Sequence, residues 1–473
     1  LYQPRRVRVY SLGEFGYNSI EIMNNRSNRP HPLPIERFLR PLHDFVHEQA
    51  SGGIVLLASA IVALFWANSL WSGVYYDIFH TEISLKVGSF GLSDTLLHWI
   101  NDGLMVVFFF VIGLEIKREV RYGELSSPRL FLLPVIAAVG GMVVPAMIYA
   151  IFNFRSQGLI GWGIPMATDI AFALGILSLL GSRVPLALKS FLVAVAIIDD
   201  LGAVLVIAVF HTEEISFISL LFGVGILAVL VVLNRVGVRH PMPYILAGLF
   251  VWLAFLQSGV HATIAGVLVA ATIPGASRID ERGILATERE PLDGLEGLGD
   301  LGQSVHAQQA RQSALIEIEQ TLSHVWNPLQ RLEHSLHPWV AFVIMPLFAL
   351  ANAGVSIGVT FVSHLLNPIS LGIIVGMVIG KQAGITFAAW LAVRLGFGVL
   401  PRGVTWPQIY AVAWLGGIGF TMSLFISILA FSQNDLLMIA KIGITTASLI
   451  SGVTGFVLVH KFTAPPDAGK KEI

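Results

Sequence analysis

The stretch Ala194-Val-Ala-Ile-Ile-Asp-Asp-Leu-Gly-Ala203 places two adjacent aspartates, Asp199 and Asp200, inside an apolar run over residues 185–210. A helix of this length, at a rise of about 1.5 Å per residue, crosses the hydrocarbon core of a bilayer. A carboxylate in the middle of a span costs at least about 2.5–3.5 kcal/mol on insertion scales. We therefore predict a membrane-spanning helix with functional aspartates, in preference to a pair that only bonds neighbouring helices for packing.

The composition of the chain agrees with a membrane protein. Of 473 residues, 55% are hydrophobic and 12% are charged, whereas soluble domains carry about 25% charged residues. The net charge of −1 gives no indication of a nucleic-acid partner, and the lack of cysteine excludes disulfides and thiolate metal sites. The first long apolar run, near Gly52, is long enough to be a span, so we expect no cleaved signal peptide.

Twelve segments are candidate spans, which predicts an all-α polytopic membrane protein. The seventh and eighth are short and separated only by Gln257-Ser258-Gly259, so they could form one kinked helix. The candidates lie near residues 52–70, 95–116, 130–153, 159–181, 185–210, 215–234, 241–257, 259–274, 338–359, 370–393, 408–431 and 437–460.

Basic residues on short loops predict the orientation, because they favour the cytoplasmic side of a membrane. They gather on alternate loops, whereas the intervening loops hold Lys86, Arg155 and, in the fifth loop, none. With twelve spans, this pattern places both termini in the cytoplasm. The basic residues of the alternate loops are Lys117, Arg118, Arg121, Arg129, Arg183, Lys189, Arg235, Arg239, Arg394 and Arg402.

Polar segments flank and interrupt the membrane domain, which we expect over residues 51–461. Residues 1–50 are predicted to form a cytoplasmic tail, with Ile35–Glu48 as a helix on the membrane surface. Residues 275–330 are acidic and rich in Gly and Gln, which favours a flexible inserted cytoplasmic loop. Residues 462–473 are predicted to form a cytoplasmic C-terminal tail.

Residues 80–92 alternate apolar and polar side chains on either side of Gly88-Ser89, which predicts a β-hairpin on the outer side of the membrane. A small exposed hairpin is unstable alone. Its free edge can pair with a second copy, so the pattern favours a homodimer that is joined through this hairpin.

The aspartate pair has the chemistry that proton and cation exchange needs. Adjacent helix positions differ in direction by about 100°, so Asp199 and Asp200 cannot face one partner equally. Their mutual repulsion and their burial both disfavour the charged form. Such a site can hold protons, or release them and bind a hard cation through oxygen ligands.

A second aspartate, Asp169, follows Gly161, Gly163 and Pro165, which should interrupt the fourth span and free backbone groups. The eleventh span carries a similar break at Leu415-Gly-Gly-Ile-Gly-Phe-Thr421. Matching breaks in two halves point to a transport site. If spans 3–5 and 10–12 are inverted repeats, the discontinuous helices cross at mid-membrane, and a packing kink is the alternative for each break.

Two further charges lie within predicted spans. In the crossed arrangement, Asp169 would offset the positive N-terminal ends of the half-helices, and Lys381 in span ten would offset the negative C-terminal ends. Lys381 could also pair with Asp199 or Asp200 and lose that partner when a cation or proton binds, or it could snorkel to an interface. Asp102, near the start of span two, either lines an access path or caps the helix.

Titratable residues also gather at the predicted cytoplasmic rim, where histidine could sense pH because it titrates nearest neutrality. From spacing alone, an ordinary solvated loop face is the preferred interpretation. The group comprises Glu115, Lys117, Arg118, Glu119, Arg331, Glu333, His334 and His337.

Ten motifs follow one another between about residues 50 and 460. They are Ala50-Ser-Gly-Gly53, Trp99-Ile-Asn-Asp102, Val111-Ile-Gly-Leu-Glu-Ile-Lys-Arg-Glu119, Ala167-Thr-Asp-Ile-Ala-Phe-Ala-Leu-Gly175, Gly181-Ser-Arg-Val-Pro-Leu-Ala-Leu-Lys189, Ala196-Ile-Ile-Asp-Asp-Leu-Gly-Ala203, Ser258-Gly-Val-His-Ala-Thr263, Arg331-Leu-Glu-His334 with His337-Pro-Trp339, Ala351-Asn-Ala-Gly-Val355 and Gly417-Ile-Gly-Phe-Thr-Met422. In this order they resemble the NhaA family of bacterial sodium/proton antiporters, which is itself a standard example of inverted repeats.

The resemblance implies roles for particular residues. Asp200 would carry the cation and the protons with Asp199 beside it, and the two would bind Na⁺ or Li⁺. Thr168 and Asp169 would belong to the broken-helix assembly, and Lys381 would match the buried lysine of the family. The pH-response region would comprise Glu115, Glu119, Glu333, His334 and His337.

The resemblance also implies an electrogenic antiporter in a bacterial inner membrane, with no cofactor and no enzymatic activity. It would exchange more protons inward than Na⁺ or Li⁺ outward, as a dimer joined through the outer hairpin. The long N-terminal tail and the large insertion before Arg331 depart from the family. We expect this chain to share the transport chemistry of the family. We do not expect it to share the pH profile, because the insertion enters the region that the resemblance assigns to pH response.

We hypothesise alternating access, and three other functions compete with it. A sodium-coupled solute symporter would need a roomy polar site, and the spans carry few groups for one. An intramembrane aspartyl protease needs aspartates on facing helices, which Asp169 and Asp200 could imitate. A cation channel would conduct Na⁺ without coupled proton movement.

Overall fold

The computed structural model describes residues 49–87, 90–122, 128–210, 215–275, 327–358, 360–431 and 433–463. In these ranges the chain is mostly helical, with one two-stranded sheet, as predicted. Eight of the described helices are long and apolar enough to cross a membrane, or up to ten if each of two bent helix pairs is one span. The chain is therefore a multi-pass membrane protein, and the predicted count of twelve is not reached by this test.

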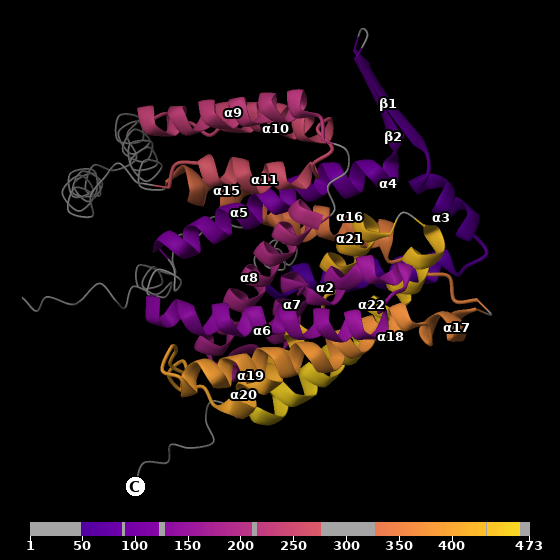
Figure 1. The fold of residues 1–473 in the computed structure, drawn as a ribbon, viewed down its shortest axis with the longest axis vertical. Helices are drawn as coiled ribbons and strands as arrows, with labels where there is room; N and C mark the ends of the chain where they lie inside the picture. Colours follow the sequence, from indigo (N-terminus) through magenta and orange to yellow (C-terminus); the bar gives the residue numbers. More distant parts are fainter. Residues whose placement is uncertain are drawn as a thin grey trace, which may run out of the picture. The chain divides into compact units, whose positions relative to one another are not determined.

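The first half of the described chain runs from indigo through magenta to rose in Figure 1 and holds five of the eight single helices long enough to cross a membrane. Its elements are α2 Gln49–Ala67, α3 Ser72–Phe79, β1 Glu82–Val87, β2 Phe90–Thr95, α4 Leu96–His98, the π-helix η2 Trp99–Leu104, α5 Met105–Tyr122, α6 Pro128–Phe152, the 3-10 helix η4 Gln157–Met166, α7 Ile170–Leu179, η5 Gly181–Arg183, α8 Leu186–Phe210, α9 Phe217–Val236, α10 Met242–Leu256 and α11 Thr263–Thr272.

The second half, in orange to yellow, is more often interrupted (Figure 1). Its elements are α15 Pro328–Trp339, the π-helix η6 Val340–Ile344, α16 Met345–Asn352, α17 Phe361–Leu365, α18 Pro368–Val375, the π-helix η7 Gly376–Gly380, α19 Lys381–Arg394, α20 Trp406–Gly416, α21 Phe420–Ala430 and α22 Asn434–Phe462.

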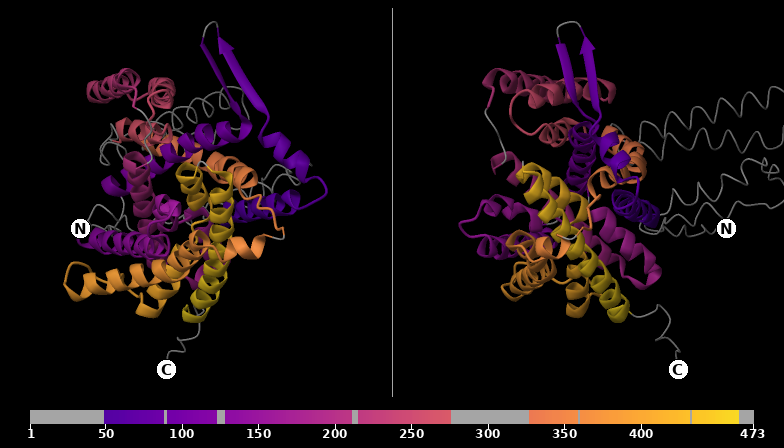
Figure 2. Two further views of the ribbon diagram at one scale, coloured as in Figure 1. Left: turned by 45° about the vertical axis from the view of Figure 1, so that its right-hand side comes forward. Right: turned by 90° about the vertical axis from the view of Figure 1, so that its right-hand side faces the viewer.

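The predicted hairpin is present. Strands β1 and β2 pair antiparallel, with Glu82 opposite Thr95 and Val87 opposite Phe90. Both views in Figure 2 show the two strands extending away from the helices of the membrane domain. Among the described residues, β1 and β2 are the only strands of this sheet, so the outer edge of each strand can pair with a strand of another chain.

The seventh and eighth predicted segments form separate helices, α10 and α11, as in the prediction of twelve segments. Gly259 between them adopts a φ of +78°, a conformation that glycine reaches easily. The ninth begins at Pro328 rather than near residue 338. The cause is local, because the Asn327 side chain caps the helix by accepting from the Gln330 N–H at 2.8 Å.

Close helix packing brings α6 against α19. A Cβ on Gly384 would lie 2.2 Å from the Gly140 carbonyl oxygen, and a Cβ on Gly140 would lie 2.4 Å from the Ala388 Cβ. Only residues without a side chain allow the two backbones to approach this closely. This contact fixes α19, which begins at Lys381, against α6.

Helix α8, which carries the aspartate pair, contacts α6, η4, α7, α20 and α21. The elements with the two predicted breaks therefore surround it. Three predicted segments lie outside the described residues, either wholly or for the most part: the surface helix Ile35–Glu48, the inserted loop over residues 275–330 and the C-terminal tail over residues 462–473.

Candidate functional site

Two non-helical segments lie beside α8. Helix η4 ends at Met166 and α7 begins at Ile170, whereas α20 ends at Gly416 and α21 begins at Phe420. The two segments bond each other directly, because the Asp169 N–H donates to the Ile418 carbonyl at 2.6 Å. Four helix ends therefore meet in one place, where backbone groups without a partner inside their own helix can bond to side chains.

Asp169 lies at the N-terminal ends of both α7 and α21. Its carboxylate accepts from the Phe172 N–H at 3.0 Å, and from the Thr421 N–H at 3.0 Å and the Thr421 hydroxyl. The side chain is fully buried. Because helix N-termini carry partial positive charge, one carboxylate offsets two such ends at once.

Lys381 forms a buried ion pair with Asp199. Its Nζ lies 2.7 Å from Asp199 Oδ2 and also donates to the Met166 carbonyl at the end of η4. Both side chains are fully buried. A buried ion pair holds only when further hydrogen bonds compensate for the lost water, and the Met166 carbonyl supplies one of them.

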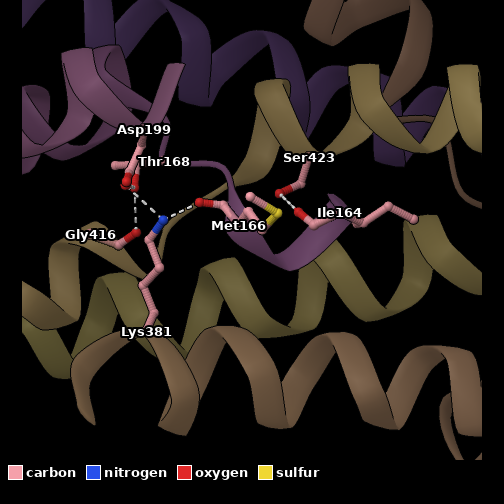
Figure 3. A network of polar contacts seen from close by, with 7 residues as sticks. All are labelled: Ile164, Met166, Thr168, Asp199, Lys381, Gly416 and Ser423. Atoms are coloured by element: carbon pink, nitrogen blue, oxygen red, sulfur yellow. Dashed lines mark hydrogen bonds and ion pairs between the residues drawn. The ribbon is translucent and has the colours of Figure 1, made fainter. Parts of the chain in front are cut away.

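Thr168 completes this network, which Figure 3 shows. Its Oγ1 lies 2.7 Å from Asp199 Oδ2 and 2.8 Å from the Gly416 carbonyl oxygen at the end of α20. The hydroxyl therefore links the aspartate helix α8 to the second break. On the other side, the Ser423 hydroxyl donates to the Ile164 carbonyl at 2.8 Å.

Asp200 has a different environment from its neighbour. It is 1% exposed, and neither of its carboxylate oxygens has a hydrogen-bond partner among the described residues. The same holds for Asp199 Oδ1. Buried oxygens without partners are costly and are ready to bind a proton or a hard cation.

No group of three or more His, Cys, Asp or Glu side chains in the described ranges could hold a metal ion. A cation at Asp199 and Asp200 would therefore need neutral oxygens as its remaining ligands. Hydroxyls, carbonyls and water are the usual neutral ligands of hard cations.

The rim residues meet where α5 packs against α15. Arg118 joins two carboxylates, with its Nε 2.9 Å from Glu333 Oε1 and its Nη1 2.7 Å from Glu119 Oε1. Glu115 lies on α5 with Arg118 and Glu119, and His337 lies on α15 with Glu333. The structure thus brings these residues together across two helices.

His334 also lies on α15, one turn before His337. Lys117, on α5, donates to the Ala271 and Ile273 carbonyls at 2.5 and 2.6 Å, at the end of α11. Lysine is a suitable partner there, because the last carbonyls of a helix carry partial negative charge.

Asp102 lies apart from this network, in the π-helix η2. Its Oδ2 is 3.1 Å from His98 Nε2, and neighbouring Asn101 accepts from the Asn352 amide at 2.7 Å. Single π-turns are frequent at functional sites. In the described part of the chain, the ion pairs of Asp102 and of Asp199 share no residue.

Several contributors to the site carried little or no signal in the sequence. Thr421 was part of a motif, but its contact with Asp169 spans 252 positions of the chain. The Met166 and Gly416 carbonyls became available only because the helices end there. The sequence therefore indicated where the helices break and left open which atoms would meet.

Fold and site together define a multi-pass membrane protein with buried ionisable groups between the ends of several helices. The chain belongs to the Na⁺/H⁺ antiporter 1 family, because the sequence model of that family matches residues 43–459. This finding confirms the resemblance noted from the motifs.

Curated relatives cover nearly the whole chain. Na⁺/H⁺ antiporter NhaA of Oleidesulfovibrio alaskensis is 50% identical over 429 residues, which are 91% of this chain and 95% of the relative. Na⁺/H⁺ antiporter NhaA of Sulfurimonas denitrificans is 47% identical over 431 residues, 90% of this chain and 97% of the relative. Na⁺/H⁺ antiporter NhaA 2 of Syntrophotalea carbinolica is 45% identical over 434 residues, which are 92% of this chain and 99% of the relative.

Proposed function

We propose that the chain is a secondary active transporter that exchanges Na⁺ or Li⁺ for protons. The observation that carries this proposal is Asp200, a fully buried carboxylate without a hydrogen-bond partner among the described residues. The names of the relatives, Na⁺/H⁺ antiporters, support the same function.

The two aspartates have different roles in this proposal. Lys381 and Thr168 already occupy Asp199 Oδ2, which leaves Asp199 Oδ1 and both oxygens of Asp200 for a cation or protons. A cation that binds there competes with Lys381 for Asp199, because both are positive charges on one carboxylate. The Thr168 hydroxyl, freed carbonyls and water would complete the coordination shell of the bound cation.

Electrogenic exchange follows from the number of carboxylates. The site binds one cation when it faces the cytoplasm, and protons displace that cation when it opens outward. If both Asp199 and Asp200 return protonated, more positive charge moves inward than outward in each cycle. A membrane potential that is negative inside then drives cation export.

Twelve spans with inverted repeats supply the moving parts in this proposal. The breaks beside Asp169 and at Gly417–Gly419 are the crossing points of two discontinuous helices in spans four and eleven. Helices α10 and α11 are short spans, and both termini face the cytoplasm of a bacterium, with the chain in its inner membrane. Alternating access is then a movement of the repeat bundle against the remaining helices.

The rim cluster is the proposed pH-response region. Arg118 holds Glu333 and Glu119 together, and Glu115, His334 and His337 lie on the same two helices, α5 and α15. A change in protonation alters the balance of charge around Arg118 and hence the contact between these helices. Asp102 lines the path by which cations reach the site in this proposal.

The test is a flux assay in proteoliposomes that report internal pH. An outward Na⁺ gradient should drive proton uptake, and Li⁺ should replace Na⁺, whereas choline should not. Asp200→Asn should abolish the exchange. Asp77→Asn is the matched control, because Asp77 is an exposed aspartate on α3.

Three outcomes would contradict the proposal. Na⁺ flux without proton movement would indicate a channel. Exchange at the wild-type rate in Asp200→Asn would show that the site lies elsewhere. No response to Na⁺ or Li⁺ at any pH, in folded and inserted protein, would exclude antiport altogether.

A further inference from the structure

Three polar groups gather around Gly417, the first residue after α20. A Cβ on Gly417 would lie 2.6 Å from the Met377 carbonyl oxygen, 2.7 Å from Gln382 Nε2 and 2.8 Å from Ser451 Oγ. The three residues belong to η7, α19 and α22. We call Met377, Gln382 and Ser451 the Gln382 cluster.

The side chains of this cluster are buried and lack partners. Gln382 is 2% exposed and Ser451 is fully buried. Both amide atoms of Gln382 and the Ser451 hydroxyl have no hydrogen-bond partner among the described residues. Ser448, one turn earlier on the same face of α22, also has an unpartnered hydroxyl. Native proteins fill such places with ordered water, because unpaired buried polar groups cost folding free energy.

The position of the cluster connects it to the ion site. Gln382 directly follows Lys381, and both come after the π-turn η7, so a shift of this turn moves both side chains. Gly417 directly follows Gly416, whose carbonyl contacts the Thr168 hydroxyl. The Gln382 cluster therefore lies next to both the second break and Lys381.

We propose that Gln382 and Ser451 hold an ordered water against the Met377 carbonyl, and that Gln382 is thereby a positioning residue for the break between α20 and α21. The water supplies two hydrogens and two acceptor sites, which suit a carbonyl, an amide and a hydroxyl. Gln382 does not touch the transported ion. It sets the geometry in which Thr168 and Lys381 hold Asp199, and in this respect the inference rests on the proposed function.

The test replaces Gln382 by a residue of similar shape without the amide. In Gln382→Met, hydrogen exchange of the backbone amides of Gly417–Phe420 should become about tenfold faster in purified protein, because the hydrogen-bonded cluster that packs against Gly417 is lost. The Na⁺ concentration for half-maximal exchange should rise several-fold, whereas the maximal rate should stay near that of the wild type. Thr386→Val is the matched control, since Thr386 on α19 also has a buried hydroxyl without a partner among the described residues, but it is not one of the three groups nearest to a Cβ on Gly417.

Ser451→Ala is the second variant, and it should change hydrogen exchange at Gly417–Phe420 in the same direction. Wild-type exchange of these amides in both variants would overturn the inference. Faster exchange throughout the chain would also overturn it, because that result indicates general loosening rather than positioning. Hydrogen exchange needs no transport, so a wild-type protein without Na⁺/H⁺ exchange would contradict the proposed function alone.

Discussion

At the scale of single residues, the adjacent aspartates Asp199 and Asp200 have opposite surroundings. Asp199 Oδ2 lies 2.7 Å from Lys381 Nζ and 2.7 Å from Thr168 Oγ1, whereas both oxygens of Asp200 lack partners in the described part of the chain. The difference follows from helix geometry, because neighbouring side chains point about 100° apart. One aspartate can thus be anchored while the next stays available to an ion.

The ion pair between Lys381 and Asp199 makes a stability prediction. Lys381→Met leaves the Asp199 carboxylate buried without its cation and should lower the free energy of unfolding by about 3–5 kcal/mol. The double variant Lys381→Met with Asp199→Asn should recover much of this loss, because no unpaired charge remains. Unfolding of the purified protein in a detergent titration measures both values.

Thr168→Val is the comparison for this pair, because it removes one hydroxyl and no charge. Its cost should be about 1.5–3 kcal/mol, which is the usual range for a hydrogen bond to a charged group. If the single Lys381 variant and the double variant lost the same free energy, the pair would not be coupled and the account of Asp199 would be wrong.

At the scale of elements, three π-helical turns in the described ranges lie beside residues of the proposed transport path, pH-response region and ion site. Asp102 lies within η2, η6 interrupts the helix after the rim cluster, and η7 ends directly before Lys381. A π-turn widens the helix and redirects the side chains that follow it. The turn of η7 therefore helps to aim Lys381 at Asp199.

The crossing of α6 and α19 makes a second prediction. Gly384→Ala puts a Cβ 2.2 Å from the Gly140 carbonyl, so the helices must separate. The loss of stability should be about 1–3 kcal/mol, as for overpacked cores. Gly225→Ala on α9 is the matched control, because a Cβ there meets nothing within 4 Å. Equal unfolding free energies for the two variants would contradict the close crossing.

The sequence predicted the helical elements better than the contacts between them. Apolar runs located most helices within a few residues, because lipid selects long apolar segments. The start at Pro328 was missed, since the first turns of α15 are polar and the apolar signal begins only later. The π-turns left no recognisable signal. The two breaks were indicated by Gly and Pro, but the contact between Asp169 and Thr421 depends on how distant segments pack.

At the scale of the whole molecule, the hairpin predicts how two copies associate. The chain contains no cysteine, so any disulfide or thiol cross-link in a single-cysteine variant must join two chains. Ser93→Cys on β2, or its register partner Ser84→Cys on β1, should yield a cross-linked dimer with a short bifunctional thiol reagent in membranes. Strand pairing brings such positions within about 5 Å of a partner strand.

Ser363→Cys on the short helix α17 is the control and should remain monomeric under the same conditions. A dimer that forms equally in all three variants would indicate random collision. Monomers alone in the two hairpin variants would contradict a dimer that is joined through strands β1 and β2.

The central claim is that a cation and protons compete for the carboxylates of Asp199 and Asp200, and above all for that of Asp200. The direct measurement is proton release from purified protein in weakly buffered solution when NaCl is added, at a series of pH values. The wild type should release protons on binding Na⁺. Its apparent Na⁺ affinity should rise by about tenfold per pH unit for each proton displaced, because protonation of the site opposes cation binding.

Asp200→Asn should bind no Na⁺ at this site and release no protons, whereas the control Asp77→Asn should match the wild type. Proton release and Na⁺ binding in Asp200→Asn that equal those of the wild type would contradict the account.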